Sequence, residues 1–446
     1  MKTPFRSIEG SIVAPRGFRA GGVFCDIKRI GTGKGSEKGQ KRDLAIIASV
    51  VPCSVAGLFT TNQICAAPVK VCVDIVRGGS AQAIVVNSGN ANACTGRQGL
   101  LDARAMTKAT GAALGLPAEA VLVASTGRIG VNLPMPQVRA GIRAVSDVLG
   151  SSADHAAQTA ESIMTSDTRP KQIAVEFLWD GLPVRLGGVC KGAGMIQPGM
   201  SATGARPPAF PSGLHATMLA FLTTDAAIDS SHLQPILEEA VALSFNRITV
   251  DGDMSTNDTV LLLANGLAGN PKPRGRKPSG KGLESFRAAL NHVCLDLAKK
   301  IVRDGEGVHR VVTVKVEGAR TSLEADAAAR AVANSALVKT SWHGGDPNWG
   351  RIIDALGYSS ATIVENKVDI GYSAPGGRNV LWSLKRGQPT RATFADLCAA
   401  VAPSEFELHI RLGLGRGKAT IYAADLTEAY VDFNKGNVAD PKSLGG

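Results

Sequence analysis

Thr217 is the residue of this sequence best placed to act as a nucleophile. It stands where a polar, Gly- and Pro-rich stretch, residues 197–215, meets the apolar run 216–222, so an exposed segment meets a buried strand. A threonine that heads a chain can use its own α-amine as the base, because the amine has a pKa of about 7.7–8.0. This requires the Ala216–Thr217 bond to be cut first, which the Thr217 hydroxyl could do by attacking the Ala216 carbonyl to form an ester that water resolves. On position alone, an ordinary threonine of a buried strand is the simpler interpretation.

Other common catalytic arrangements lack their sequence motifs. The chain has no GxSxG nucleophile elbow, no HExxH, no Walker A motif and no dinucleotide-binding fingerprint. The run 31–36 (GTGKGS) looks like part of a phosphate loop, but it lacks the required spacing and polar residues follow it, so a flexible loop is the better interpretation. The seven histidines are dispersed along the chain, and we expect no metal site.

A mixture of strands and helices must position these residues. Apolar spacing predicts helices at residues 102–114, 137–149, 233–244, 283–302 and 327–337. Short apolar or alternating runs predict strands at residues 23–25, 44–51, 83–86, 120–124, 173–177, 182–186, 216–222, 248–253, 259–264 and 312–316. Residues 406–421 are typical of a hairpin that turns at 413–417. Because no regular βα period is present, the sequence predicts an α+β sandwich and not a doubly wound parallel sheet.

The positive charge of the chain is concentrated in two loops. The formal net charge is +11, from 49 basic and 38 acidic residues. Residues 31–42 hold four basic residues and one acid, and residues 270–282 hold five basic residues and no acid. Both segments are rich in Gly, and the second also in Pro, which favours solvated loops over a basic domain. We therefore expect no nucleic-acid partner.

The cysteines and the apolar stretches predict the compartment. The eight cysteines form no CxxC pair, and the sequence opens without an apolar leader. This pattern is typical of a reduced, cytoplasmic protein. The longest apolar stretch, residues 44–59, is interrupted by Ser, Pro and Gly, so we expect no membrane span.

Several motifs resemble the ornithine acetyltransferase family of arginine biosynthesis, also called glutamate N-acetyltransferase. The most specific are the run around the Ala216–Thr217 junction and the DPNWGR motif. They occur in family order along the chain: residues 86–93 (VNSGNANA), 125–127 (STG), 164–171 (MTSDTRPK), 191–200 (KGAGMIQPGM), 216–225 (ATMLAFLTTD), 251–258 (DGDMSTND), 304–307 (DGEG), 346–351 (DPNWGR) and 425–427 (DLT).

The resemblance implies a self-cleaving enzyme. Cutting between Ala216 and Thr217 would leave an α chain of residues 1–216 and a β chain of residues 217–446. The freed Thr217 would accept an acetyl group from N-acetylornithine and pass it to glutamate through an acyl-enzyme. Thr126 and Gly127 match the family's oxyanion hole, where a hydroxyl and a backbone N–H point at one oxygen. Without the resemblance, the STG run is a turn that ends a strand.

The resemblance also implies the substrate contacts and the assembly. Thr165, Lys191, Glu306 and Asn434 match substrate-binding positions, together with Thr217. Lys191 could neutralise an α-carboxylate and Glu306 could meet the side-chain amine of ornithine; without the resemblance both are ordinary surface charges. The family implies an α2β2 tetramer, no metal and no prosthetic group, with acetyl-CoA as a further possible substrate. The implied fold is a sandwich of sheets flanked by helices, with a smaller α/β lobe.

Three features depart from the family pattern. Residues 201–215 look like an insertion just before the cleavage bond, and Thr203 stands in a copy of the junction that lacks the apolar strand after it. Ala439 occupies a position where a hydroxyl residue is expected. Met254 replaces a usual Thr, and Arg128 replaces a usual apolar residue.

Two alternatives follow from these departures. The first is a paralogue on the same scaffold that acts as an amidohydrolase, or that acts on another acyl amino acid. The second is an uncleaved, non-enzymatic binding protein.

Overall fold

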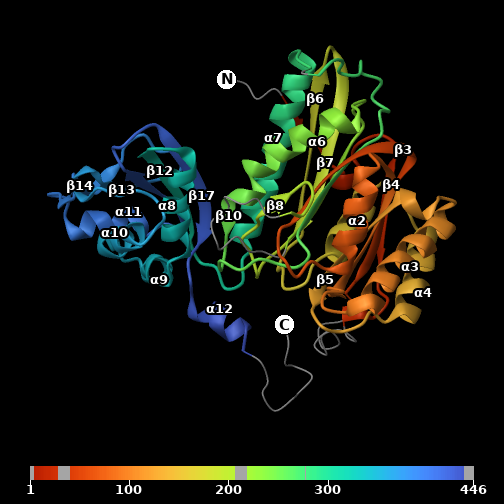
Figure 1. Ribbon diagram of the computed structural model, residues 1–446, viewed down its shortest axis with the longest axis horizontal. Helices are drawn as coiled ribbons and strands as arrows, with labels where there is room; N and C mark the ends of the chain where they lie inside the picture. Colours follow the sequence, from red (N-terminus) through yellow and green to blue (C-terminus); the bar gives the residue numbers. More distant parts are fainter. Residues whose placement is uncertain (1–4, 29–40, 206–217, 277, 436–446) are drawn as a thin grey trace.

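The computed structural model describes residues 5–28, 41–205, 218–276 and 278–435. Within these ranges the chain forms a large lobe around a ten-stranded sheet and a smaller lobe around a seven-stranded sheet (Figure 1). None of the described helices is long and apolar enough to cross a bilayer.

The ten-stranded sheet combines strands from distant parts of the sequence. Its spatial order is β1 (Phe5–Ser7), β6 (Lys171–Trp179), β7 (Leu182–Lys191), β9 (Leu219–Thr224), β11 (Thr259–Ala264), β3 (Leu44–Thr60), β4 (Ser80–Asn90) and β5 (Val121–Arg128), with β2 (Phe18–Val23) and β8 (Met200–Ser201) paired to β3. Strand β9 is antiparallel to β7 and parallel to β11. A strand that follows residue 217 is therefore enclosed by the sheet.

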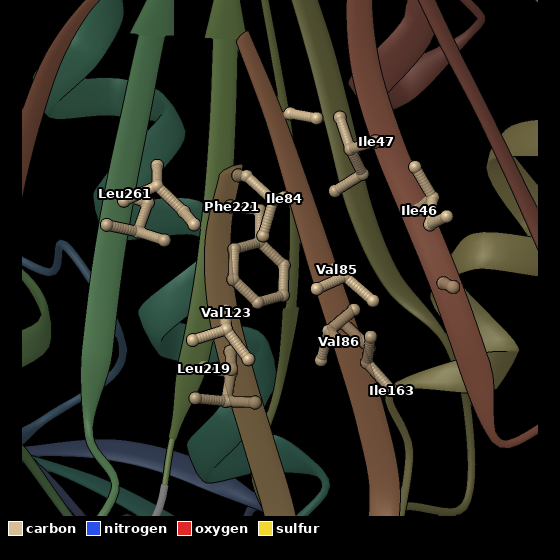
Figure 2. Packing of buried hydrophobic residues seen from close by; sticks show 14 of the residues in the cluster. Ile46, Ile47, Ile84, Val85, Val86, Val123, Ile163, Leu219, Phe221 and Leu261 are labelled. Atoms are coloured by element: carbon tan, nitrogen blue, oxygen red, sulfur yellow. The ribbon is translucent and has the colours of Figure 1, made fainter. Parts of the chain in front are cut away.

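The long strand β3 joins two halves of this sheet. Residues 44–48 pair with β2 and β4, whereas residues 54–59 pair with β11. Figure 2 shows Phe221 of β9 and Leu261 of β11 in the same core as Ile84 of β4 and Val123 of β5. The two halves therefore pack on one another as a sandwich, because side chains alternate between the faces of each strand.

Helices cover the two outer faces of the sandwich. Contacts with β2, β3 and β5 are made by α2 (Ala67–Arg77), α3 (Gly96–Leu114), α4 (Met135–Asp147) and α5 (Ala153–Ser162). Contacts with β3, β6 and β7 are made by α6 (Ser230–Ala242) and α7 (Lys281–Arg303). The apolar face of α7 forms a core with the residues of β9 and β11 that point away from the sandwich interior, such as Leu222 and Leu262.

The smaller lobe has its own core. Its sheet runs in the order β10 (Ile248–Thr249), β17 (Gly417–Ala424), β12 (Val311–Ala319), β16 (Glu405–Arg411), β13 (Asp369–Ser373), β14 (Leu381–Lys385) and β15 (Gln388–Pro389). Its helices are α8 (Ser322–Asn334), α9 (Ala336–Gly344), α10 (Trp349–Gly357) and α11 (Phe394–Val401), and α12 (Glu428–Phe433) follows β17. Single 3₁₀ turns lie at Ser11–Val13, Ala118–Ala120, Phe245–Arg247 and Glu365–Lys367.

The predicted α+β class is confirmed, and three local predictions differ from the structure. Residues 406–421 do not form a hairpin, because β12 lies between β16 and β17, parallel to the first and antiparallel to the second. The strand expected at 248–253 is only the two-residue β10, and a short strand, β8, interrupts the stretch 197–215 that was expected to be irregular. The predicted turn at Asp180-Gly181 joins β6 and β7, and both of its residues have positive φ.

Candidate active site

The expected cleavage bond, between Ala216 and Thr217, lies outside the described residues. The description resumes at Met218, directly before β9. The Met218 N–H donates to Oδ1 of Asp258 at 2.5 Å, and the Met218 carbonyl oxygen accepts from the Thr259 N–H at 3.1 Å. The N–H and the carbonyl oxygen of Met218, the residue after the expected nucleophile, are therefore both hydrogen-bonded.

Asp258 is a buried carboxyl with one oxygen unused. Its Oδ2 is buried and has no hydrogen-bond partner among the residues that the structure describes. Burial raises the pKa of this carboxyl well above its usual value, against the opposing effects of the Met218 N–H and the nearby Lys191. A protonated Asp258 could donate a hydrogen bond toward the head of β9.

Thr126 and Gly127 end β5 beside the end of β4. Gly127 has a φ of 129°, and a Cβ there would lie 2.4 Å from the Gly89 carbonyl carbon, so only glycine fits. The Thr126 side chain is buried, and its Oγ1 has no hydrogen-bond partner within the described ranges. A buried, unpartnered hydroxyl beside a glycine N–H is the donor pair that an oxyanion hole requires.

Asn257 links this pair to the head of β9. Its Nδ2 donates to the carbonyl oxygen of Ser125 at 2.8 Å and to that of Ala91 at 2.6 Å. Asn257 directly precedes Asp258. One of these side chains therefore holds the Ser125-Thr126-Gly127 turn, and the next holds the Met218 backbone. The fold thus brings together two segments about ninety residues apart in sequence.

Lys191 ends β7 and lies opposite Leu219 in the register of β7 and β9. Its side chain is 2% exposed, and Nζ lies 4.0 Å from Oδ2 of Asp167. Burial lowers the pKa of the ammonium below its usual value, while Asp167, Glu306 and Asp258 attract its charge. Lys191, which without the family resemblance would be an ordinary surface charge, is therefore a buried cation among three carboxyl groups.

Asp167 organises the side of the site that contains Lys191. Its carboxylate accepts from Nζ of Lys171 at 2.6 Å, from the Gly192 N–H at 2.7 Å and from the Thr165 N–H at 3.0 Å. Burial alone would raise the pKa of Asp167, but Lys191 and Lys171 lower it to about 2. The carboxylate therefore stays charged and holds Thr165 and Lys191 around itself.

A second carboxylate completes this network. Asp304 pairs with Lys171 and also accepts from the hydroxyl and the N–H of Thr168. Burial opposes the charge of Lys171, but Asp167 and Asp304 together raise its pKa. Asp304 begins the DGEG motif, so the network fixes the loop that carries Glu306.

Glu306 and Asn434 are in direct contact. Asn434 Nδ2 donates to Oε2 of Glu306 at 3.0 Å, although the residues are far apart in sequence. The Glu306 N–H donates to the Ala193 carbonyl oxygen at 3.0 Å. A Cβ on Gly194 would lie 2.5 Å from the Glu306 carboxylate, so the glycine leaves the space that this side chain occupies.

Thr165 lies at the edge of a cavity. The cavity has a volume of about 550 Å³ and is lined in part by Thr165, Glu161 and three basic residues, Lys28, Lys41 and Arg42. Burial lowers the pKa of Lys28 to about 8, against the attraction of Asp43 and Glu161. Thr165 thus lines an open space together with three basic and two acidic side chains, of which Arg42 and Glu161 form an ion pair.

A family model decides the classification of the chain. The model described as the ArgJ family matches residues 21–436. The chain belongs to the ArgJ family. The prediction of an acetyltransferase of arginine biosynthesis is therefore confirmed at the level of the family.

Individual ArgJ relatives match over nearly the whole chain. The "arginine biosynthesis bifunctional protein ArgJ" of Symbiobacterium thermophilum is 44% identical over 427 residues, which cover 96% of this chain and 98% of the relative. The protein of the same name from Geobacter sulfurreducens is 42% identical, with 94% and 98% covered. A solved ornithine acetyltransferase complexed with ornithine, from Mycobacterium tuberculosis, is 37% identical, covers 44% of this chain and all of that chain, and has a TM-score of 0.40.

Sequence reasoning missed four polar residues of this ArgJ site. Asp167, Asn257, Asp258 and Asp304 lie inside motifs that carry the resemblance, but none was assigned a role. The available signal was that the three aspartates lie inside the motifs of the family resemblance, and an aspartate needs partners when it is buried. Their partners come from other elements, so the sequence alone did not reveal which charge each one meets.

Proposed function

We propose that this chain is a self-processing acetyltransferase that moves acetyl from N-acetylornithine to glutamate through an acyl-enzyme on Thr217. The observation that carries the proposal is the convergence of Thr126, Gly127 and Lys191 on the anchored head of β9. The unpartnered Thr126 hydroxyl and the Gly127 turn lie on one linked segment, and the buried ammonium of Lys191 lies opposite Leu219. The proposal rests also on family membership.

Processing would precede transfer. The Thr217 hydroxyl attacks the Ala216 carbonyl carbon, and the peptide nitrogen leaves as the α-amine of Thr217. Water then hydrolyses the ester, which releases the Ala216 carboxylate and restores the hydroxyl. The Asp258 carboxyl, already bound to the Met218 N–H, would hold the new terminus in place. The product has a nucleophile and its base on one residue.

Acetyl transfer would proceed in two halves. The α-amine takes the hydroxyl proton as Thr217 attacks the acetyl carbonyl carbon, and ornithine leaves with that proton on its amine. The amine of glutamate then attacks the ester and regenerates Thr217. In both halves Thr126 and Gly127 would donate to the oxyanion, and such a donor is typically worth about 2.7–4 kcal/mol in the transition state.

The charged side chains suit an amino-acid substrate. Lys191 is the buried cation for an α-carboxylate, and Glu306, which is only partly buried, is the anion for an amine. Asn434 donates to Glu306 and would orient it. A basic amino acid acylated at its α-nitrogen, such as N-acetylornithine, has charges of the matching signs.

The two proposed fragments would remain one folded unit. Strands β9 and β11 belong to residues 217–446, yet they pair with β7 and β3 of residues 1–216. Separation would break sheet pairing and split the sandwich core, so the fragments stay associated after cleavage. An α2β2 tetramer would be two such units, and a cytoplasmic location stays a prediction.

Acetyl-CoA is a second acetyl donor to consider. The wall of Lys28, Lys41 and Arg42 around the 550 Å³ cavity would attract the phosphate groups of such a donor, and Thr165 lines the same cavity. The experiment is acetylglutamate formation from acetyl-CoA and glutamate, without N-acetylornithine. A Lys41→Ala variant should raise the KM for acetyl-CoA and leave that for N-acetylornithine unchanged.

Cleavage is tested on a denaturing gel with N-terminal sequencing. We expect two fragments of roughly half length, one of which starts with Thr-Met-Leu-Ala-Phe; a start at Thr-Gly-Ala-Arg-Pro would move the junction to Thr203. Thr217→Ala should remain one band and lack transfer, and Thr217→Ser should keep both activities at a lower rate. Uncut protein with full transfer activity would contradict the proposal. Release of acetate in place of acetylglutamate would favour the alternative of an amidohydrolase on the same scaffold.

A further inference from the structure

Two histidines that are far apart in sequence meet an aspartate in the smaller lobe. His309 precedes β12, His343 lies at the end of α9, and Asp425 directly follows β17. One ligand atom of each side chain lies within 4.8 Å of the others. The sequence predicted no metal site because its histidines are dispersed, whereas the fold places these two side by side, with ring centroids 5.2 Å apart.

Two atoms at the centre of this cluster are buried and lack hydrogen-bond partners. They are Nδ1 of His343 and Oδ2 of Asp425, and neither has a partner in the part of the chain that the structure describes. They lie 3.4 Å apart, and the Asp425 side chain is fully buried. Buried polar atoms are rarely left without partners, so something that the protein atoms do not supply belongs between them.

The other nitrogen of His343 indicates what is missing. Nε2 lies 2.8 Å from Oε2 of Glu428. In a neutral ring Nε2 therefore carries the hydrogen and donates a hydrogen bond to this carboxylate. The lone pair of Nδ1 then faces Oδ2 of Asp425. Both atoms are hydrogen-bond acceptors, so neither can donate a hydrogen bond to the other. A carboxylate that orients a histidine in this way is the usual outer partner of a metal-bound imidazole.

The nearby cations do not fill the gap. Nζ of Lys339 attracts Asp425 but donates to the carbonyl oxygen of Ala424. Arg310 donates to the carbonyl oxygens of Trp342 and His343. The other oxygen of Asp425, Oδ1, accepts from the His309 N–H at 3.0 Å, which points Oδ2 toward the rings.

We propose that His309, His343 and Asp425 form a Zn²⁺ site. Two imidazole nitrogens and one carboxylate oxygen are ligands that Zn²⁺ takes, with water in the fourth position. Two ligands that are each about 2.1 Å from a tetrahedral ion are about 3.4 Å apart, which matches the 3.4 Å between Nδ1 and Oδ2. His309 is exposed and its ligand atom lies within 4.8 Å of those of His343 and Asp425, so it can supply the third protein ligand.

The bound ion would tie together the loop of Glu306 and the segment of Asn434. His309 lies three residues after Glu306, and Asp425 precedes α12, which leads to Asn434. Thr427 already joins these segments, because its hydroxyl donates to the Gly307 carbonyl oxygen at 2.7 Å. If the proposed function holds, Zn²⁺ would stiffen the subsite for the ornithine side chain.

Metal binding is measured without substrate, so the result does not depend on the proposed function. Untagged protein carrying Cys94→Ser, which removes an exposed thiol, is stripped with EDTA, dialysed and titrated with ZnCl₂ by calorimetry. We expect one saturable Zn²⁺ per chain and a higher melting temperature with Zn²⁺ than with EDTA.

Matched variants assign the site. His309→Asn and His343→Asn should weaken Zn²⁺ binding by more than the roughly 10–100-fold expected for Glu428→Gln, because they remove ligands and not an outer partner. His292→Asn changes an exposed histidine of α7 outside the cluster and should leave binding unchanged. His309 is exposed, so its variant is expected to fold.

Two results would overturn the proposal. The first is a titration in which Zn²⁺ shows no saturable binding, or in which the His309→Asn protein binds Zn²⁺ as tightly as its parent does. The second is a melting temperature that is the same with Zn²⁺ as with EDTA.

Discussion

The Asp167→Asn substitution removes the charge at the centre of the buried network. The asparagine keeps the shape and one acceptor, but it leaves Lys171 with Asp304 alone and takes the nearest carboxylate from Lys191. It also puts an amide N–H₂ either where Oδ1 accepted from the Gly192 N–H and Lys171, or where Oδ2 accepted from the Thr165 N–H.

Two arguments give the free energy of unfolding that Asp167→Asn should lose at neutral pH. The fall in the pKa of Asp167 from 3.8 to about 2 corresponds to roughly 2 kcal/mol of stability, at about 1.4 kcal/mol per pKa unit. Removal of one partner from a buried ion pair typically costs about 3–5 kcal/mol. Because Asp304 still compensates Lys171, we expect a loss of about 2–3 kcal/mol.

The loss should depend on pH with a definite sign. The folded-state pKa of Asp167 is depressed, so its stabilisation is present above the unfolded pKa and is lost as pH falls toward the folded pKa. Between pH 4 and pH 2 the difference between wild type and Asp167→Asn should therefore shrink, and about half of it should be gone by pH 3.

The assay is urea unfolding followed by tryptophan fluorescence at pH 7, 5 and 3, with uncut Thr217→Ala protein as the background for every variant. Asp147→Asn removes an exposed carboxylate at the end of α4 and serves as the control. The reasoning is refuted if Asp167→Asn and Asp147→Asn unfold at the same urea concentration at pH 7, or if their difference is constant from pH 7 to pH 3.

Three further substitutions test other contacts. Thr126→Val keeps the shape and removes a hydroxyl without a described partner, so the melting temperature should hold while kcat falls about 10²–10³-fold; an unchanged kcat removes Thr126 from the oxyanion hole. Gly194→Ala displaces the Glu306 carboxylate and should raise the KM for N-acetylornithine more than that for glutamate, whereas Gly357→Ala, which meets nothing within 4 Å, should change neither. Asp258→Asn should keep or raise stability at pH 7, increasingly so above pH 4, because burial raises the pKa of that carboxyl; a loss of several kcal/mol would mean that Asp258 is charged beside Lys191.

Local sequence pattern predicted the elements whose own residues pack them. Residues 283–302 were predicted as a helix and lie in α7. An apolar stripe at helical spacing favours a helix with one buried face, and this does not depend on which element packs against it. The pairing of β16 and β17 was mispredicted for the opposite reason: strands adjacent in sequence favour a hairpin, but β12, from about ninety residues earlier, lies between them. Partner choice in a sheet is a property of the whole fold.

The candidate site divides in the same way. The motifs of the family resemblance pointed to six residues: Thr126, Gly127, Thr165, Lys191, Glu306 and Asn434. In the described structure Asp167 contacts both Thr165 and Lys191, Asn434 contacts Glu306, and Asn257 holds the turn that carries Thr126 and Gly127. The expected nucleophile, Thr217, lies outside the described residues and stays a prediction. The environment of each charge was not predictable: without the family resemblance Lys191 would be an ordinary surface charge, but it is buried.

The sequence by itself determined the family, the α+β class and which side chains have the chemistry for acyl transfer, because these depend on residue type, spacing and motif order. Only the tertiary structure decided which charges lie close together. Burial and Coulomb energies depend on distances in space, and those distances join Asp167 to Lys191, Asp258 to Met218, and His309 to His343. Asp167, Lys191 and Asp258 would have ordinary pKa values in an unfolded chain.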